Sequence, residues 1–143
     1  MIRPIVTWDL PALRRRSLPV PDVTRDIRHL VADMFDTLQE AGGVGLSAIQ
    51  VGVPLRVAVL AIDGHRLALI NPHVLVRNRR RVKGVEGCLS LPGIVRKVKR
   101  PYDMIVSFMD TDGQAFQIRA DGLQARVIGH EMDHMDGKLI VDY

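Results

Sequence analysis

The sequence predicts an α+β fold, in which antiparallel sheets pack around a C-terminal helix and one further helix lies near the N-terminus. Apolar residues recur at helical spacing between residues 24 and 41, and a second helical segment follows between residues 121 and 136. Between these segments, short apolar stretches alternate with turn dipeptides, as antiparallel hairpins require. A helix, several antiparallel strands and a final helix are typical of the α+β class.

The first twenty residues are expected to be extended and irregular rather than helical. Four prolines interrupt this stretch: Pro4, Pro11, Pro19 and Pro21. Proline lacks the backbone N–H that a helix interior needs, and its ring clashes with the preceding turn.

The segment Thr24–Ala41 is the first predicted helix. Asp22 or Thr24 would cap its start, and Gly42 and Gly43 would end it. Its apolar face consists of Ile27, Leu30, Val31, Met34 and Leu38.

Strands are predicted in the middle of the chain. Asp63-Gly64 and Asp112-Gly113 are strong hairpin signals. The last helix is predicted from Asp121 to about Asp136, where Gly137 stops it. The predicted strands are Leu55–Ile62, Leu67–Ile70, Met104–Asp110 and Gln114–Ala120, with Ile94–Arg100 as a weaker fifth.

The composition is that of a globular protein, and the length of 143 residues suits a single domain spanning residues 1–143. The chain is 47% hydrophobic and 25% charged. No apolar run is long enough to span a bilayer, and the N-terminus lacks the apolar stretch of a secretory signal. Cys88 is the single cysteine, so it forms no internal disulfide. We expect a cytoplasmic protein with no membrane partner.

The positive charge is local. The net charge is +4, and basic residues gather in Arg14–Arg16 and Arg77–Lys83. A basic run can bind nucleic acid, but it is more often a solvated loop or a charged edge strand. Because only 4% of the residues are aromatic, few side chains could stack on bases. Nucleic-acid binding is therefore not expected as the primary role.

The most informative stretch is His130-Glu131-Met132-Asp133-His134. Two histidines four residues apart lie on one face of a helix, so both imidazoles can reach one metal ion. Glu131 and Asp133 flank them almost symmetrically; Glu131 is favoured as general base because its side chain reaches further and the known motif places the base there. Asp133 is then a supporting carboxylate. A solvated helix face without metal is the alternative.

A catalytic site of this kind needs a third protein ligand. In the metzincin motif a third histidine follows the pair, but Ile140 occupies that position here. Zincins that use a downstream glutamate need more than the nine residues that follow His134, so we expect the third ligand upstream. Cys88 is favoured over a purely structural cysteine, because Glu86–Gly93 has the composition of a tight loop that presents a thiol. The other candidates are His29, His65, His73 and any acidic side chain.

The glycine-rich stretch Gly42–Gln50 is neither a phosphate loop nor a dinucleotide fingerprint, because it lacks the lysine and the preceding strand that these require. Its glycines would let the backbone approach a ligand closely. The Gln50 amide could donate to a carbonyl oxygen. A flexible connector between helix and strand is the alternative.

Together, three stretches resemble the signature motifs of the peptide deformylase family, in the same order and at similar spacing. They are Gly43–Gln50, Glu86–Ser90 and His130–His134. The early Leu10–Arg14 and the segment Asp121–Val127 are also similar to the family. The resemblance implies removal of the formyl group from the N-terminal methionine of nascent polypeptides.

The resemblance also implies roles for individual residues. Cys88, His130 and His134 match the metal ligands, and Glu131 matches the catalytic acid/base. Gln50 and the backbone N–H of Leu89 match the groups that polarise the formyl carbonyl. The remaining matches concern substrate: the backbone of Gly43–Gly45 would pair with the peptide, while Val44, Glu86, Leu123, Val127 and His130 would surround the methionine side chain.

The implied cofactor is one divalent cation, Fe²⁺, for which Zn²⁺, Ni²⁺ or Co²⁺ can substitute. The expected partners are formylmethionyl peptides and, transiently, the ribosome, and the protein is expected to be a monomer. Many bacterial members add a C-terminal helix, whereas Tyr143 follows Gly137 by six residues here. Two other functions stay open: a metal-dependent peptidase or amidase acting on another acyl group, and a non-catalytic metal-stabilised module that binds RNA or the ribosome through Arg77–Lys83.

Overall fold

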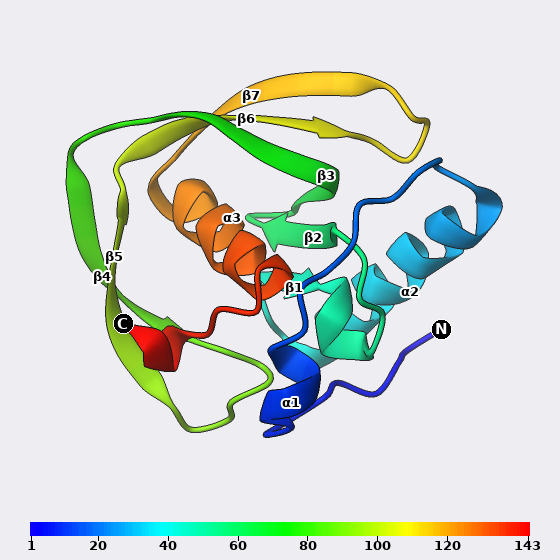
Figure 1. Ribbon diagram of the computed structural model, residues 1–143, viewed down its shortest axis with the longest axis horizontal. Coiled ribbons are helices and arrows are strands. Elements are labelled where there is room, and N and C mark those ends of the chain that lie inside the picture. Colours follow the sequence, from blue (N-terminus) through cyan, green and yellow to red (C-terminus); the bar gives the residue numbers. More distant parts are fainter.

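The α+β fold predicted from the sequence is confirmed (Figure 1). The computed structural model describes residues 1–143, with two sheets arranged around the C-terminal helix. No helix combines the length and the apolar character that crossing a bilayer demands. The elements are α1 (Leu10–Leu13), α2 (Arg25–Ala41), β1 (Gly45–Ser47), the 3₁₀ helix η1 (Ala48–Val51), β2 (Val57–Ile62), β3 (His65–Arg77), β4 (Arg81–Gly87), β5 (Val95–Pro101), β6 (Asp103–Met109), β7 (Ala115–Asp121), α3 (Gly122–Met135) and the 3₁₀ helix η2 (Ile140–Asp142).

The larger sheet has five antiparallel strands in the order β1-β2-β3-β6-β7, and β4 and β5 form a separate two-stranded ribbon. Helix α3 lies between the ribbon and the larger sheet (Figure 1). Strand β1 is at one edge of the larger sheet, so one side of its backbone is free to pair with another chain.

Strand β2 shows why both long helices are needed. Its residues alternate between two apolar clusters: Val57 and Val59 pack with α2, whereas Leu60 packs with the residues of α3. Since successive side chains of a strand point to opposite faces, a strand that is apolar throughout must be covered on both sides. Helices α2 and α3 provide that cover.

Helix α2 agrees with the sequence prediction. The Thr24 side chain accepts a hydrogen bond from the backbone N–H of Ile27 (3.4 Å), so Thr24 rather than Asp22 is the cap. Gly42 follows the last turn with φ of 69°, a left-handed conformation that suits glycine. The five predicted apolar residues of this helix are all buried.

The prediction that the first twenty residues contain no helix is wrong at Leu10–Leu13, which form α1. Pro11 lies in the first turn, where the backbone N–H has no helical partner to lose. The Asp9 side chain accepts a hydrogen bond from the N–H of Ala12 (3.2 Å) and caps this short helix.

Strand β3 is much longer than the predicted Leu67–Ile70, because it continues through Asn71-Pro72 to Arg77. The predicted strand ended at Ile70, directly before that dipeptide. In the structure Asn71 has φ of 52° and the pairing with β6 shifts in register beside it, as at a β-bulge. The Asn71 side chain is held by hydrogen bonds with the backbone N–H and C=O of Val20, both 2.8 Å.

Strand β4 was not predicted as such. Arg77–Lys83 was expected to be a loop or an edge strand, and Glu86–Gly93 a loop. Instead Arg81–Gly87 pairs with β5 over its whole length, and the turn that carries the thiol begins only at Cys88. The strand is mostly exposed and two of its residues are glycines, so its sequence shows no regular apolar alternation.

The C-terminal residues pack back on α1. Gly137 has φ of 74°, and a Cβ at this position would overlap the carbonyl oxygen of Arg14. The Arg14 guanidinium in turn donates to the carbonyl oxygen of Gly137 (3.0 Å) and to the carboxylate of Asp142 (2.8 Å). This contact fixes the segment that follows α3.

We expect Gly137→Ala to lower the free energy of unfolding by more than Gly113→Ala. Both glycines have φ near +75°, so both variants cost about 1 kcal/mol or more of backbone strain. Only the Gly137 variant also forces a Cβ against Arg14, because Gly113 has open space around it. Urea unfolding of both variants measures the difference; equal losses would contradict the close packing described here.

Candidate active site

Three metal-ligating side chains meet between α3 and the turn after β4. His130 and His134 lie one turn apart on α3, and their Nε2 atoms are 3.2 Å apart. The Sγ atom of Cys88 is 3.4 Å from Nε2 of His134. All three ligand atoms lie within 4.8 Å of one another. The structure thus brings together the histidine pair and the distant thiol.

These distances fit a common divalent cation. With metal–nitrogen bonds of about 2.0–2.1 Å and a metal–sulfur bond of about 2.3 Å, tetrahedral ligands are separated by roughly 3.3–3.6 Å. Mixed nitrogen and sulfur ligation suits zinc and other late first-row metals. The other histidines considered as ligands lie exposed on α2 and β3: His29, His65 and His73.

The surroundings of the two histidines shift their pKa values in opposite directions. His134 is 1% exposed, and burial lowers its pKa to about 3, so its imidazole is neutral, as a ligand must be. Burial also disfavours the charged form of His130, but hydrogen bonds with Cys88 and Glu86 outweigh it and raise its pKa to about 10. A cation at this site would therefore compete with a proton for His130.

A buried carboxylate supports the first histidine. Oε1 of Glu86 lies 2.9 Å from Nδ1 of His130, leaving Nε2 directed at the other ligands. Arg100 binds the same carboxylate through two hydrogen bonds of 2.9 and 2.7 Å, and Arg126 adds a third of 2.7 Å. Burial would raise the pKa of Glu86, but the bonds from Arg100 and His130 lower it to about 2.

Sequence reasoning missed the two arginines of this cluster. Arg100 is 5% exposed although it lies in a strand otherwise rich in exposed cations. The alternation of β5 is the signal that could have found it, because Val98 and Arg100 point to the same buried face. Arg100 also binds Asp133 (2.6 Å), which makes that residue a supporting carboxylate, and Tyr143 donates to Asp133 (2.7 Å).

Glu131 lies on the pocket side of α3. It is 3% exposed, its Oε2 atom has no hydrogen-bond partner, and burial raises its pKa. Strand β1 passes so close that a Cβ on Gly45 would lie 2.9 Å from Oε1 of Glu131 and 2.6 Å from a methyl carbon of Val127. The glycine is therefore required for the backbone of β1 to border the carboxylate.

Gln50 is held in one orientation. Its side-chain oxygen accepts a hydrogen bond from the backbone N–H of Ser47 (2.9 Å), and its Nε2 donates to the hydroxyl of Ser90 (3.1 Å) and lies 3.8 Å from Sγ of Cys88. The stretch Gly42–Gln50 is thus not a flexible connector, because β1 and η1 order it. The side-chain N–H₂ group of Gln50 faces the ligand cluster.

A cavity of about 370 Å³ opens beside the ligand cluster. Cys88, His130 and Glu131 border it, whereas His134 lies behind its wall. The other predicted site residues all line the cavity as well: Gly43, Val44, Gly45, Gln50, Glu86, Leu89, Leu123 and Val127. Residues from three distant parts of the chain therefore share one pocket.

An α+β fold with a buried carboxylate between two histidines on a helix, and a third ligand at the pocket wall, defines the class of metal-dependent hydrolases. The profile of the family described as polypeptide deformylase matches residues 2–143. The chain belongs to the polypeptide deformylase family, and this confirms the resemblance found in the sequence.

Relatives in sequence and in structure agree with this assignment. The chain is 40% identical to the peptide deformylase of Rhizobium meliloti (strain 1021), over 99% of this chain and 84% of the relative. It is 45% identical to that of Alkalilimnicola ehrlichii, over 97% of this chain and 80% of the relative. The crystal structure of peptide deformylase from Thermotoga maritima superposes with a TM-score of 0.96 at 33% identity, covering 99% of this chain and 97% of that one.

We expect Glu86→Gln to weaken metal binding about 10- to 100-fold, because the group that orients His130 loses its charge. The change also leaves the buried Arg100 with one carboxylate fewer, so the free energy of unfolding should fall by about 3 kcal/mol. Competition with a fluorescent chelator measures the first effect and urea unfolding the second.

Asp103→Asn is the matched control, since Asp103 pairs with Arg119, whose side chain is 61% exposed. This variant should change the metal affinity by no more than about twofold and the free energy of unfolding by no more than about 0.5 kcal/mol. Unaltered metal affinity in Glu86→Gln would show that Glu86 does not orient the ligand.

Proposed function

We propose that this chain removes the formyl group from the N-terminal formylmethionine of nascent polypeptides and releases formate. Residues 1–143 would form its single catalytic domain, working in the cytoplasm as a monomer. The observation that carries this proposal is the shared pocket: three convergent ligand atoms, a buried carboxylate and a backbone edge meet there. The family supports the reaction, since its named relatives are peptide deformylases.

Cys88, His130 and His134 would hold one divalent cation, which we propose to be Fe²⁺, with Zn²⁺, Ni²⁺ or Co²⁺ able to substitute. Such an ion supplies a Lewis acid that polarises a carbonyl group. It also lowers the pKa of a water molecule, so that a hydroxide nucleophile is available at neutral pH. The chain contributes three ligands, so one position is left for the reactants.

Glu131 would act as the general acid and base. It would accept a proton from the attacking water and later return it to the nitrogen of the departing amine. Two features support this role: the unpartnered Oε2 atom, and burial that raises the pKa of the carboxyl towards the range where proton transfer is efficient.

The amide of Gln50 and the backbone N–H of Leu89 would stabilise the negative charge that develops on the formyl oxygen. The Gln50 amide is already oriented by Ser47 and Ser90, so little reorganisation is needed when the charge forms. Donors fixed in advance are the most effective ones in such sites.

The free edge of β1 would bind the peptide. Gly43–Gly45 borders the pocket, and β1 has only one partner strand, so an extended substrate can add to it through main-chain hydrogen bonds. The methionine side chain would then lie among apolar and polar pocket residues: Val44, Glu86, Leu123, Val127 and His130.

We expect Glu131→Gln to bind the metal normally but to lose about 10²–10⁴-fold in turnover of a formyl-methionyl peptide, because the proton acceptor is gone. Asp133→Asn is the matched control: it removes the other carboxylate of the same motif, whose contacts are Arg100 and Tyr143 and not the pocket. Formate release and metal content are measured for both, with Asp133→Asn staying within about tenfold of the unmodified chain. Full activity of Glu131→Gln would rule out the role given to this residue.

Removing the metal with a chelator under anaerobic conditions should abolish formate release, and adding back Fe²⁺ or Ni²⁺ should restore it. Cys88→Ser should prevent this recovery, since the hydroxyl is a poor substitute for a thiolate. The same assay separates the alternatives. Cleavage of an internal peptide bond without formate would indicate a peptidase, and metal binding without turnover of any acyl substrate would indicate a non-catalytic module.

A further inference from the structure

The charge of this protein is divided very unevenly along the chain. Residues 77–101 contain nine lysines and arginines and one acidic residue, Glu86, which gives this segment a net charge of +8. The remaining residues contain eleven basic and fifteen acidic side chains, a net charge of −4. The segment comprises the end of β3 together with the ribbon of β4 and β5.

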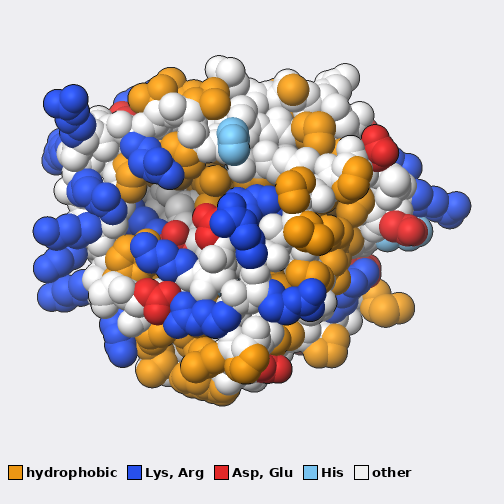
Figure 2. Space-filling view, viewed as in Figure 1, with side chains coloured by type: hydrophobic (Ala, Val, Ile, Leu, Met, Phe, Trp, Pro, Cys, Tyr) orange, Lys and Arg blue, Asp and Glu red, His pale blue; other side chains and the backbone are white.

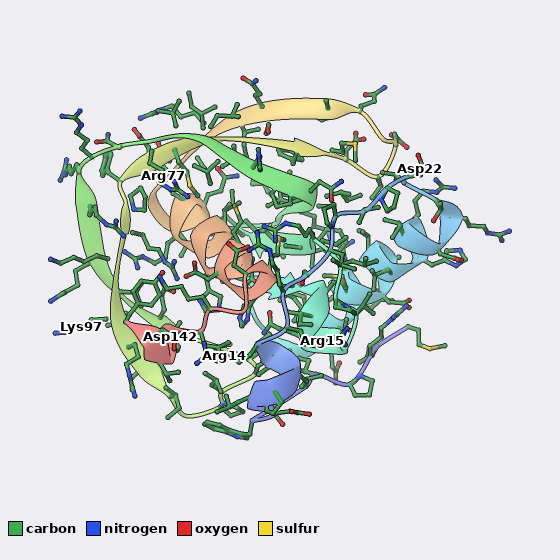
Figure 3. All side chains as sticks on the ribbon, in the orientation of Figure 1. Arg14, Arg15, Asp22, Arg77, Lys97 and Asp142 are labelled. Atoms are coloured by element: carbon green, nitrogen blue, oxygen red, sulfur yellow. The ribbon has the colours of Figure 1, made fainter.

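Eight of these cations are exposed, and we call them the basic ribbon: Arg77, Arg79, Arg80, Arg81, Lys83, Arg96, Lys97 and Lys99. They gather at the left edge of the molecule in Figure 2. Arg77 and Lys97 are labelled on that side in Figure 3, whereas Arg15 lies beside α1.

The basic ribbon forms no salt bridge, although ion pairs are common elsewhere on the surface. Arg3 pairs with Asp33, Arg14 with Asp142 and Arg56 with Asp136. The partners of these cations are uncharged: Arg81 donates to the carbonyl oxygen of Lys99 (2.9 Å), Arg96 donates to that of Val95 (2.9 Å), and the Arg80 guanidinium lies over the ring of Tyr102. The cations of this surface are therefore free to bind an anion from outside.

The arrangement costs stability in the isolated protein. Lys83 of β4 lies directly opposite Lys99 of β5, and like charges in that position repel. Charged side chains, lysine in particular, also protect an edge strand from aggregation. Eight exposed cations on one surface, none of them in a salt bridge, form a larger charge cluster than that protection explains and indicate a polyanionic partner.

We propose that the basic ribbon binds the phosphate backbone of RNA at the surface of the ribosome. This inference rests on the proposed function, because a nascent chain is held where ribosomal RNA presents phosphates. Five of the eight cations are arginines, whose planar forks match phosphate oxygens. Proteins that bind membrane surfaces present exposed tryptophan, phenylalanine or leucine beside their cations. The exposed apolar side chains of β4 and β5 are only valines, which disfavours a membrane as the partner: Val82, Val85 and Val95.

The position of the ribbon suits this partner. Strand β4 carries Lys83 in its middle and ends at Gly87, which borders the pocket. Four residues of extended strand span about 13 Å. RNA bound to the basic ribbon would thus lie close to the mouth of the pocket.

The test compares two variants with the same change in net charge. Arg79→Gln/Lys83→Gln/Lys97→Gln/Lys99→Gln neutralises four residues of the ribbon that form no side-chain hydrogen bond and do not line the pocket. Arg15→Gln/Arg16→Gln/Arg25→Gln/Arg28→Gln neutralises four exposed arginines outside the ribbon. The probes are a fluorescein-labelled RNA duplex of about 20 base pairs, followed by anisotropy between 50 and 200 mM KCl, and purified ribosomes in a co-sedimentation assay.

For the ribbon variant, we expect RNA affinity at 100 mM salt to fall at least tenfold. The slope of log affinity against log salt should flatten by about 3, because each of the four lost phosphate contacts contributes roughly 0.7–0.9 to it. The amount that sediments with ribosomes should fall likewise. The control variant should stay within about twofold in both assays.

Three results would overturn the inference: equal losses in both variants, no measurable RNA affinity in the unmodified chain, or tight binding only to phosphatidylglycerol vesicles. Turnover of a free formyl-methionyl peptide is measured in parallel and should be unchanged in both variants. Absence of formate release in the unmodified chain would contradict the proposed function while leaving the RNA result to be judged separately.

Discussion

The buried carboxylate of Glu86 is the interaction on which the site depends. Glu86 is the residue before the last of β4, while its partners come from β5 and α3, so three elements meet at one group. Removing a charge from water is costly unless its partners are placed well. The geometry that satisfies Glu86 also turns Nε2 of His130 towards Cys88 and His134, so the contacts that hold β4 and β5 against α3 also position the ligand cluster.

Helix α3 connects this cluster to the core. Ala125 and Ile128 pack on the larger sheet, while His130 and Glu131 border the pocket from the same helix. Strand β1 approaches Glu131 through Gly45, and the ordered turn that follows it orients Gln50. Each group proposed to touch substrate is thus carried by an element whose position is fixed by apolar packing or by a buried hydrogen bond.

The sequence predicted the local features well and the long-range ones poorly. The histidine pair follows from helical spacing alone, and the glycine turns and the apolar stripe of α2 are equally local signals. Cys88 was found because a histidine pair lacks one ligand. Arg100 was not found, since its only local signal is that it follows Val98 by two residues in a strand whose other cations are exposed. The Asn71-Pro72 bulge was missed for a related reason: its stability depends on the distant backbone of Val20.

The central claim is that a single cation is shared by one thiolate and two imidazoles. X-ray absorption at the metal edge of anaerobically purified protein tests it most directly. The claim predicts one sulfur neighbour at about 2.3 Å and two imidazole nitrogens at about 2.0–2.1 Å. A metal whose nearest neighbours are oxygen and nitrogen only, with no sulfur, would contradict it.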